Sequence, residues 1–422
     1  MLRARLRTWR LCRFGSHVHC LSSRRPRVVL GIESSCDDTG AAVVDEHGRV
    51  LGEALHSQKE EHLRTGGIIP HVAQALHRQH IARIVQEALE KSGLRASALS
   101  AVATTVKPGL ALSLSVGLEF TGTLLQSLPT PFIPVHHMEA HALTVRMVHP
   151  LPFPFLVLLV SGGHALLALA RGVSDFLLLG QALDEAPGDT LDKVRPSERA
   201  AAPPPGPGQI ARRLSLTGHP ECRAMGGGQA VEHLALQGDR LKFNLRTPMG
   251  HRLDCNFSFA GLRTQVERTI GRLEQEEGVR DGRVLSCVAD VCAAAQHAVC
   301  AHIAKRTHRA ILFCKARGLL PERSPTLVAS GGVASNRYAR QLLQVITDAS
   351  GLELLCPPPR LCTDNGAMVA WNGIERLREG IGILPSSAGI RYQPKATFGT
   401  DISEEVKQSA IILPPVKLRL AT

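Results

Sequence analysis

Aromatic side chains are scarce in this chain of 422 residues, at 4% of the total. That is too few for a protein whose main task is to stack the bases of a single-stranded nucleic acid. Hydrophobic residues make up 44% and charged residues 20%. This balance allows a sizeable buried core and excludes global disorder. The length suits two or three domains rather than one.

Acidic residues are absent from the first 27 positions, which hold eight arginines and three serines. This composition is typical of a mitochondrial transit peptide, and the apolar stretch of a secretory signal is missing. We therefore predict that residues 1–27 direct the protein to the mitochondrial matrix. A basic arm that binds RNA directly is the alternative. Of the net charge of +12, only about +4 belongs to the remaining chain, which is compatible with a nucleic-acid partner but does not require one.

Paired cysteines and long apolar runs are missing too. The eleven cysteines include no CxxC pair, which argues against a zinc finger. Several of them lie among apolar residues, as buried free thiols of a reducing compartment do. The most apolar stretch, residues 151–170, is interrupted by prolines and glycines. A membrane-spanning helix needs about 20 uninterrupted apolar residues, so we expect no membrane association.

The order of the expected elements indicates an internal duplication. In the first half, we predict strands at 27–32, 40–45, 50–56, 101–105 and 132–135 and helices at 70–91, 112–125 and 136–148. In the second half, we predict strands at 155–160, 165–170, 176–182 and 326–330 and a helix from 336. Each half opens with a strand and a small-residue turn. This pattern predicts a duplicated, two-lobed α/β protein with lobes at 28–150 and 151–395, a cleft between them and a tail at 396–422.

A proline-rich stretch interrupts the second half. Residues 195–210 hold five prolines in sixteen positions, which excludes the interior of a helix or a strand. Residues 191–194 and 211–216 on either side resemble two halves of one helix. We interpret the stretch as an inserted, solvated loop.

Two histidines form the sharpest candidate metal site. His137 and His141 are four residues apart in a predicted helix, so they share one face, as ligands of a single ion must. The metalloprotease motif places a glutamate directly after the first histidine, whereas Glu139 stands one position later. A metal is therefore plausible and a zinc-protease mechanism is not supported. Two surface histidines in a chain that holds nineteen are the alternative.

Polar or glycine-rich turns follow three predicted strands, at residues 33–39, 161–164 and 330–336. Small residues let backbone N–H groups approach an anion, although tight turns also use glycine for steric reasons. Together they indicate a nucleotide site. Asp364 precedes another apolar helix, where it can cap the helix or bind a metal. Capping is the better explanation from the residues alone.

Seven co-linear motifs between residues 28 and 395 closely resemble the tRNA threonylcarbamoyladenosine transferases. They lie at residues 31–39 (GIESSCDDT), 108–110 (PGL), 136–141 (HHMEAH), 160–164 (VSGGH), 257–262 (FSFAGL), 330–337 (SGGVASNR) and 362–368 (CTDNGAM). The resemblance implies an actin/Hsp70/hexokinase-like fold. It also implies transfer of a threonylcarbamoyl group from threonylcarbamoyl-AMP to N6 of adenosine 37, in tRNAs that read codons beginning with A.

The resemblance further implies one divalent metal ion, zinc or iron, held by His137, His141 and Asp364. The donor would be made by a separate threonylcarbamoyl-AMP synthase, and mitochondrial relatives are expected to be homodimers that bind tRNA. Contacts to the adenylate are implied for Asp192, which suits its ribose hydroxyls, and for Gly228 and Asn336. The substrate-binding turn comprises Val160, Ser161, Gly162, Gly163 and His164, and its amides suit the phosphate or carbamoyl oxygens.

Asp37 aligns with a residue important for catalysis in this family. Our hypothesis is that it acts as the general base, and an aspartate that bonds its own backbone in a turn is the alternative.

Two features depart from the family pattern. Residues 195–210 follow Asp192 closely, and a displaced helix there would weaken donor binding. An altered splice product or a faulty gene sequence would also explain the insertion. Residues 226–228 are Gly-Gly-Gly where the family usually has Pro-Gly-Gly or Ser-Gly-Gly. The rival interpretations are a non-catalytic tRNA-binding subunit or inactive isoform, and an ATPase or kinase of the same fold. Magnesium sites of that second class prefer oxygen ligands, which speaks against it.

Overall fold

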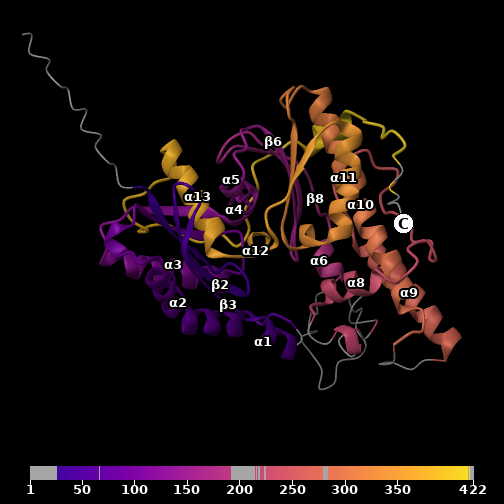
Figure 1. Ribbon diagram of the computed structural model, residues 1–422, viewed down its shortest axis with the longest axis horizontal. Helices are drawn as coiled ribbons and strands as arrows, with labels where there is room; N and C mark the ends of the chain where they lie inside the picture. The colour runs from indigo at the N-terminus through magenta and orange to yellow at the C-terminus, as the bar shows by residue number, and fades with distance from the viewer. Residues whose placement is uncertain are drawn as a thin grey trace, which may run out of the picture.

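The computed structural model describes residues 26–65, 67–191, 214, 216, 219–222, 225–278, 284–416 and 418. Nearly all of the predicted transit peptide lies outside these residues, as do Asp192 and the 195–210 insertion. The described chain forms two halves, each built around a β-sheet (Figure 1).

The first sheet consists of five largely apolar strands: β1 (Val28–Glu33), β2 (Asp38–Asp45), β3 (Val50–Ser57), β4 (Ala101–Lys107) and β5 (Phe132–His136). Their order is β3-β2-β1-β4-β5. The pairs β1–β2 and β2–β3 are antiparallel, and β1–β4 and β4–β5 are parallel. Nearly continuous burial along β1, β2 and β4 is typical of strands that are covered on both faces.

The second sheet repeats this plan and adds one edge strand. Its strands are β6 (Phe155–Val160), β7 (Ala165–Ala170), β8 (Phe176–Gln181), β9 (Thr326–Ser330), β10 (Glu353–Leu355) and β11 (Thr400–Asp401). The order β8-β7-β6-β9-β10 has the same sequence of antiparallel and parallel pairs as the first sheet. The predicted duplicated, two-lobed α/β fold of the actin/Hsp70/hexokinase type is therefore confirmed.

Helices cover both faces of the first sheet. Leu30 and Ile32 of β1 face α2 (Pro70–Ser92) and α3 (Ala111–Gln126) and share a core with them, whereas Val29 faces α13 (Gly366–Glu379). Although α13 follows β6 to β10 of the second sheet in the chain, it packs against β1 and β2. Because a helix from the predicted second lobe (151–395) covers the first sheet, the predicted lobe boundary at residue 150 stays a proposal.

The outer face of the second sheet is covered by a second set of helices. They are α8 (Gly227–Ala235), α9 (Ala260–Glu277), α10 (Val288–Ala316) and α11 (Arg337–Ser350). Cys292, Cys300 and Cys314 are buried in α10 as free thiols, as predicted, whereas Cys287 is only partly buried. Within the described residues, no helix is both long and apolar enough to cross a bilayer.

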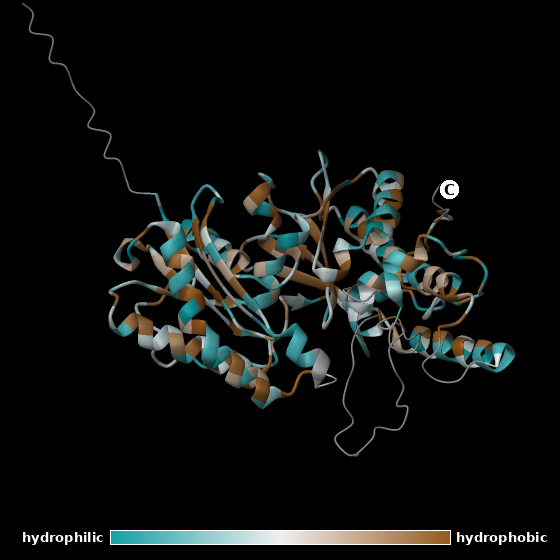
Figure 2. Cartoon of the chain, turned by 60° about the horizontal axis from the view of Figure 1, so that its bottom comes forward, coloured by the Kyte–Doolittle hydropathy of each residue, from teal (hydrophilic) through white to brown (hydrophobic). Residues whose placement is uncertain are grey.

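One hydrophobic core joins the two halves. It combines Ile133 of the first sheet, Phe155 and Val157 of the second sheet, and Met368 of α13, all of them fully buried. Figure 2 shows hydrophobic residues concentrated along the central strands. Because this core is continuous, the segments that carry the candidate site are held in a common frame.

The contact between α13 and the first sheet requires glycine. A Cβ atom on Gly366 would overlap the backbone of Ala41 and Ala42, and one on Gly31 would overlap the backbone of Ala370 and Gly366. Neither clash can be relieved by turning a side chain, because the opposing atoms belong to the main chain.

We predict that Gly366→Ala lowers the free energy of unfolding by about 1–3 kcal/mol or more, because the added methyl group forces α13 away from the sheet. Gly271→Ala is the matched control, since a Cβ there meets nothing within 4 Å and the position lies inside α9. It should raise stability by about 0.5–1 kcal/mol. Urea unfolding followed by circular dichroism measures both changes. Equal midpoints for Gly366→Ala and the unmodified protein would contradict the packing described here.

Candidate metal centre

Two histidines project from the helix that follows the first sheet. α4 (His137–Leu143) begins at the residue after β5 ends, and His137 and His141 lie on one of its faces. Their side chains are buried, and their ring centroids are 4.6 Å apart in an edge-on arrangement. The helix predicted at 136–148 is observed as α4 followed by α5 (Val145–Val148), which leaves the spacing of the pair unchanged.

His136 fixes the start of α4. Its Nδ1 atom accepts a hydrogen bond from the backbone N–H of Met138 at 3.2 Å, so its Nε2 atom donates to the carbonyl of Thr397, also at 3.2 Å. Burial, together with the nearby Lys107, lowers the pKa of His136 to about 3. His136 is therefore a neutral capping residue. Its capping role leaves no signal in the sequence, since histidine is an unusual N-cap.

Asp364 reaches the two histidines from the turn between α12 (Pro359–Cys362) and α13. Its Oδ1 atom lies 3.0 Å from His141 Nε2 and 3.5 Å from His137 Nε2. Helix capping, which the residues alone favoured for Asp364, is performed by its neighbour. Asn365 accepts a hydrogen bond from the backbone N–H of Met368 at 2.9 Å. The carboxylate of Asp364 is thus left to face the histidine pair.

These three side chains fit a divalent ion. Their ligand atoms all lie within 4.8 Å of one another. The two nitrogen-to-oxygen separations of 3.0 and 3.5 Å are those of atoms that each bind one ion at about 2.0–2.2 Å. Two imidazoles and a carboxylate suit zinc and iron alike. A set of three protein ligands also leaves coordination positions for a substrate.

Opposite charges hold the centre together. Burial alone would raise the pKa of Asp364, but His137 and His141 hold it well below its usual value. Burial opposes the charge on His137 as well, yet Asp364 and the fully buried Glu33 raise its pKa to about 9. Without a metal, His137 therefore keeps a proton between two carboxylates, and a bound ion would take the place of that proton.

The predicted substrate-binding turn lies beside this centre. It follows the buried Val160 at the end of β6, and the ring of His164 is 6.4 Å from that of His137. The hydroxyl of Ser161 accepts hydrogen bonds from the N–H groups of Gly163 and His164 at 3.4 and 3.2 Å. The carbonyl of Gly162 accepts the N–H of Asp189. Two of the amides expected to face an anion thus turn toward the Ser161 side chain.

The residues predicted to contact the adenylate have different surroundings. Asn336 caps α11 by accepting the N–H of Ala339 at 2.9 Å, and its amide donates to Gln296 at 3.0 Å. Gly228 lies in the first turn of α8, where a Cβ would meet nothing within 4 Å. Asp192 lies outside the described residues.

Comparison with known proteins identifies the family. A sequence profile described as tRNA N6-adenosine threonylcarbamoyltransferase matches residues 49–371. The chain belongs to this family. It is 64% identical over 398 residues to the mitochondrial tRNA N6-adenosine threonylcarbamoyltransferase of Danio rerio, covering 94% of this chain and 95% of the relative. It is 59% identical to the Homo sapiens mitochondrial protein of that name, covering 93% and 91%. A bacterial tRNA N6-adenosine threonylcarbamoyltransferase, from Paramagnetospirillum magneticum, is 40% identical over 89% of this chain and 97% of its own.

Asp37, the general base hypothesised from the sequence, is followed directly by a second aspartate, Asp38. Asp37 is partly buried, and its carbonyl accepts the N–H of Gln58 at 3.0 Å. Burial, reinforced by Asp37, Asp364 and Glu33, raises the pKa of Asp38 to about 7, and its buried Oδ1 atom has no hydrogen-bond partner within the described chain. A general base needs a pKa near the working pH. Asp38 has that property, and no signal in the sequence separates it from Asp37.

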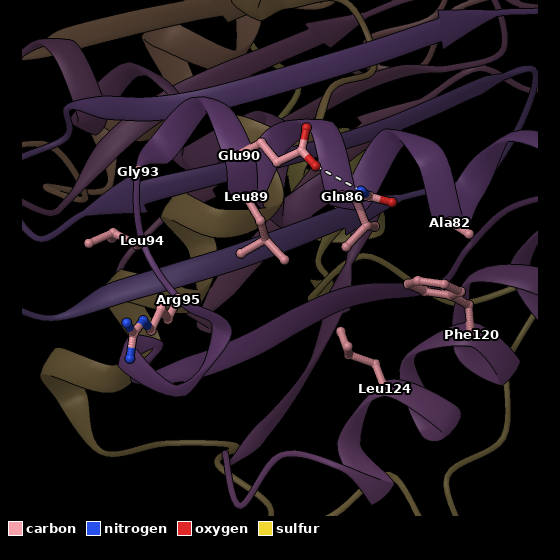
Figure 3. A pocket seen from close by; sticks show the side chains of 10 residues that line it. Ala82, Gln86, Leu89, Glu90, Gly93, Leu94, Arg95, Phe120 and Leu124 are labelled. Atoms are coloured by element: carbon pink, nitrogen blue, oxygen red, sulfur yellow. Dashed lines mark hydrogen bonds between the residues drawn. The ribbon is translucent and has the colours of Figure 1, made fainter.

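A pocket of about 380 Å³ lies elsewhere in the threonylcarbamoyltransferase chain. It is lined by residues of α2 and α3, among them Leu89, Phe120 and Leu124, and by the bend at Gly93 (Figure 3). These helices cover the face of the first sheet opposite α13. The pocket contains none of the predicted site residues.

We predict that zinc binding to the metal-free threonylcarbamoyltransferase releases a proton from His137. At pH 7.5, below the pKa of about 9, binding should release about one proton per ion, and the apparent affinity should rise about tenfold per pH unit until it levels off near that pKa. Calorimetry in two buffers of different ionisation enthalpy measures the release. His149→Ala, which changes an exposed histidine, should leave it unchanged. Zinc binding without proton release would contradict the charge arrangement.

Proposed function

We propose that this chain transfers the threonylcarbamoyl group from threonylcarbamoyl-AMP to N6 of adenosine 37 in mitochondrial tRNAs that read codons beginning with A. The product is threonylcarbamoyladenosine. The observation that carries the proposal is family membership over most of the chain, with His137, His141 and Asp364 gathered within ligand distance of one another.

The reaction makes specific demands on the protein. The donor is a mixed carbamic–phosphoric anhydride, and adenine N6 is a weak nucleophile because its lone pair is delocalised into the ring. A bond forms between N6 and the carbamoyl carbon, the bond from that carbon to the phosphate oxygen breaks, AMP departs, and N6 loses one proton. The protein must therefore position N6, accept this proton and stabilise negative charge on the donor oxygens.

The residues of this chain suit those tasks. A divalent ion on His137, His141 and Asp364 would supply Lewis-acid polarisation of the donor. In our proposal, Asp37 accepts the proton from N6, and Asp38 is the alternative base because of its raised pKa.

The remaining contacts concern the donor. The turn from Ser161 to His164 binds its phosphate or carbamoyl oxygens, and Gly228, Asn336 and Asp192 bind the adenylate. For Asn336, this contact would have to coexist with its bonds to Ala339 and Gln296.

The cellular setting follows from the same family membership. We propose that the protein acts in the mitochondrial matrix after removal of residues 1–27, since relatives at 64% and 59% identity carry mitochondrial names. A separate synthase would supply threonylcarbamoyl-AMP, and the active form would be a homodimer. A mature chain with a charge of about +4 should bind tRNA in a salt-sensitive manner.

The test is modification of a mitochondrial tRNA that reads a codon beginning with A. A chain starting at residue 28 is incubated with this tRNA and with the donor-forming synthase and its substrates, and the nucleosides are analysed by mass spectrometry. We expect threonylcarbamoyladenosine. His137→Ala should lower its rate of formation about 100-fold or more, because several kcal/mol of charge stabilisation are lost. The exposed His149→Ala serves as the matched control and should keep the full rate.

A second chain without residues 195–210 tests the insertion. Activity of both chains would identify a tolerated loop, and activity of the shortened chain alone would identify an inactive isoform or an erroneous sequence. If neither chain forms the product while both bind tRNA, the transferase proposal fails and the binding-subunit interpretation replaces it. ATP hydrolysis without a carbamoyl donor would support the kinase or ATPase class instead.

A further inference from the structure

We propose that Glu33 sets the metal-binding tautomer of His137 and is thus a positioning residue of the metal centre. The inference rests on the metal site proposed above and not on the transfer reaction, so each can fail separately. In the sequence, Glu33 is only the first residue of a polar turn, and no motif assigns it a role.

Glu33 is anchored at both of its carboxylate oxygens. Its side chain is fully buried at the end of β1. Oε1 accepts the backbone N–H of Ser35 at 2.6 Å, and Oε2 accepts the hydroxyl of Thr105 at 2.6 Å. The same Oε2 atom lies 3.2 Å from His137 Nδ1. Contacts from the turn after β1 and from the neighbouring strand β4 therefore prevent the carboxylate from swinging away from the imidazole.

This contact decides which nitrogen of His137 carries the proton once a metal is bound. The Nδ1 atom has two polar neighbours, Glu33 Oε2 and the hydroxyl of Ser35 at 3.1 Å. A hydroxyl can donate to a bare nitrogen or accept from an N–H group, so Ser35 is compatible with either tautomer. A carboxylate can only accept. The Nδ1 atom must therefore carry hydrogen, which leaves the lone pair on Nε2 facing Asp364.

His141 lacks an equivalent support. Its Nε2 atom also faces Asp364, at 3.0 Å, but its Nδ1 atom is buried with no hydrogen-bond partner within the described chain. Of the two histidines, only His137 is oriented by a carboxylate behind it. The effect of Glu33 on metal affinity should therefore be large, because among the described residues no second carboxylate supports His141 in the same way.

Glutamine is the informative replacement at this position. The pocket presents hydrogen-bond donors on both sides, the N–H of Ser35 at Oε1 and the groups of Thr105 and His137 at Oε2. Glu33→Gln supplies one acceptor oxygen, so its NH₂ group must face a donor on one side. The backbone N–H of Ser35 can only donate, whereas the Thr105 hydroxyl and His137 Nδ1 can also accept, so the NH₂ group faces these two. Nδ1 then becomes the acceptor and the hydrogen moves to Nε2, where it blocks the ligand atom.

The experiment measures Zn²⁺ affinity by competition with a chelating dye. Glu33→Gln should bind Zn²⁺ about 10–100-fold more weakly than the unmodified protein. Glu375→Gln is the matched control, since Glu375 is equally buried but pairs with Arg146 rather than with a histidine. Its affinity should not change. Equal affinity for Glu33→Gln and the unmodified protein would overturn the proposal, and so would an equal loss in both variants, because the effect would then be a general one on folding.

An NMR measurement distinguishes an effect of Glu33 on the His137 tautomer from an effect on the folding stability of the protein. In the Co²⁺-loaded protein, the imidazole N–H protons of the ligand histidines are shifted far outside the normal NMR range. We expect a slowly exchanging Nδ1–H signal from His137, which should vanish or move in Glu33→Gln and persist in Glu375→Gln. Its persistence in Glu33→Gln would refute a role of Glu33 in the tautomer.

If the glutamine variant does not fold, the same Zn²⁺ affinity is measured for Glu33→Asp. It keeps the charge but draws the carboxylate back by one methylene group. If the carboxylate must touch His137 Nδ1, Glu33→Asp should bind Zn²⁺ more weakly than the unmodified protein. Unchanged binding would mean that only the negative charge matters and would overturn the proposal. If the unmodified protein itself binds no Zn²⁺, the metal site fails together with this inference, whatever the tRNA assay gives.

Discussion

The direct contact between α13 and the backbone of the first sheet is the constraint on which the candidate site depends. Gly366 is the first residue of α13 and touches β2 with its main chain. Asp364 stands two residues earlier, so the depth at which the helix docks determines where this carboxylate lies. On the other side, β5 leads straight into α4 and its histidines. The first sheet therefore fixes the positions of both the histidine pair and Asp364.

The charges of the site also follow from this arrangement. Glu33, His137 and Asp364 are brought out of water together, and an isolated buried charge would be costly. A proton on His137 compensates the two carboxylates when no ion is present, and its raised pKa reflects this balance. The same carboxylates favour a divalent cation in place of the proton.

Much of the fold could be predicted from the sequence, and the site only in part. The strands from β1 to β9 can be predicted because runs of apolar residues, or their alternation with polar ones, leave a clear pattern, whereas the short edge strands β10 and β11 leave none. The helix spacing linked His137 to His141. Nothing in the residues linked them to Asp364, because that pairing depends on tertiary packing and came only with the family resemblance. The sequence presents Glu33 only as the start of a polar turn, because Thr105 and His137 are brought around it by the tertiary fold.

The distance in sequence between the ligands has a consequence for how the protein matures. His141 and Asp364 are 223 residues apart, so an unfolded chain offers an ion only the histidine pair. The complete site forms when α13 docks, and an ion that prefers the complete site stabilises the folded chain by the free energy of its binding. An ion bound at the complete site would therefore stabilise the folded protein, in addition to any part that it takes in the reaction.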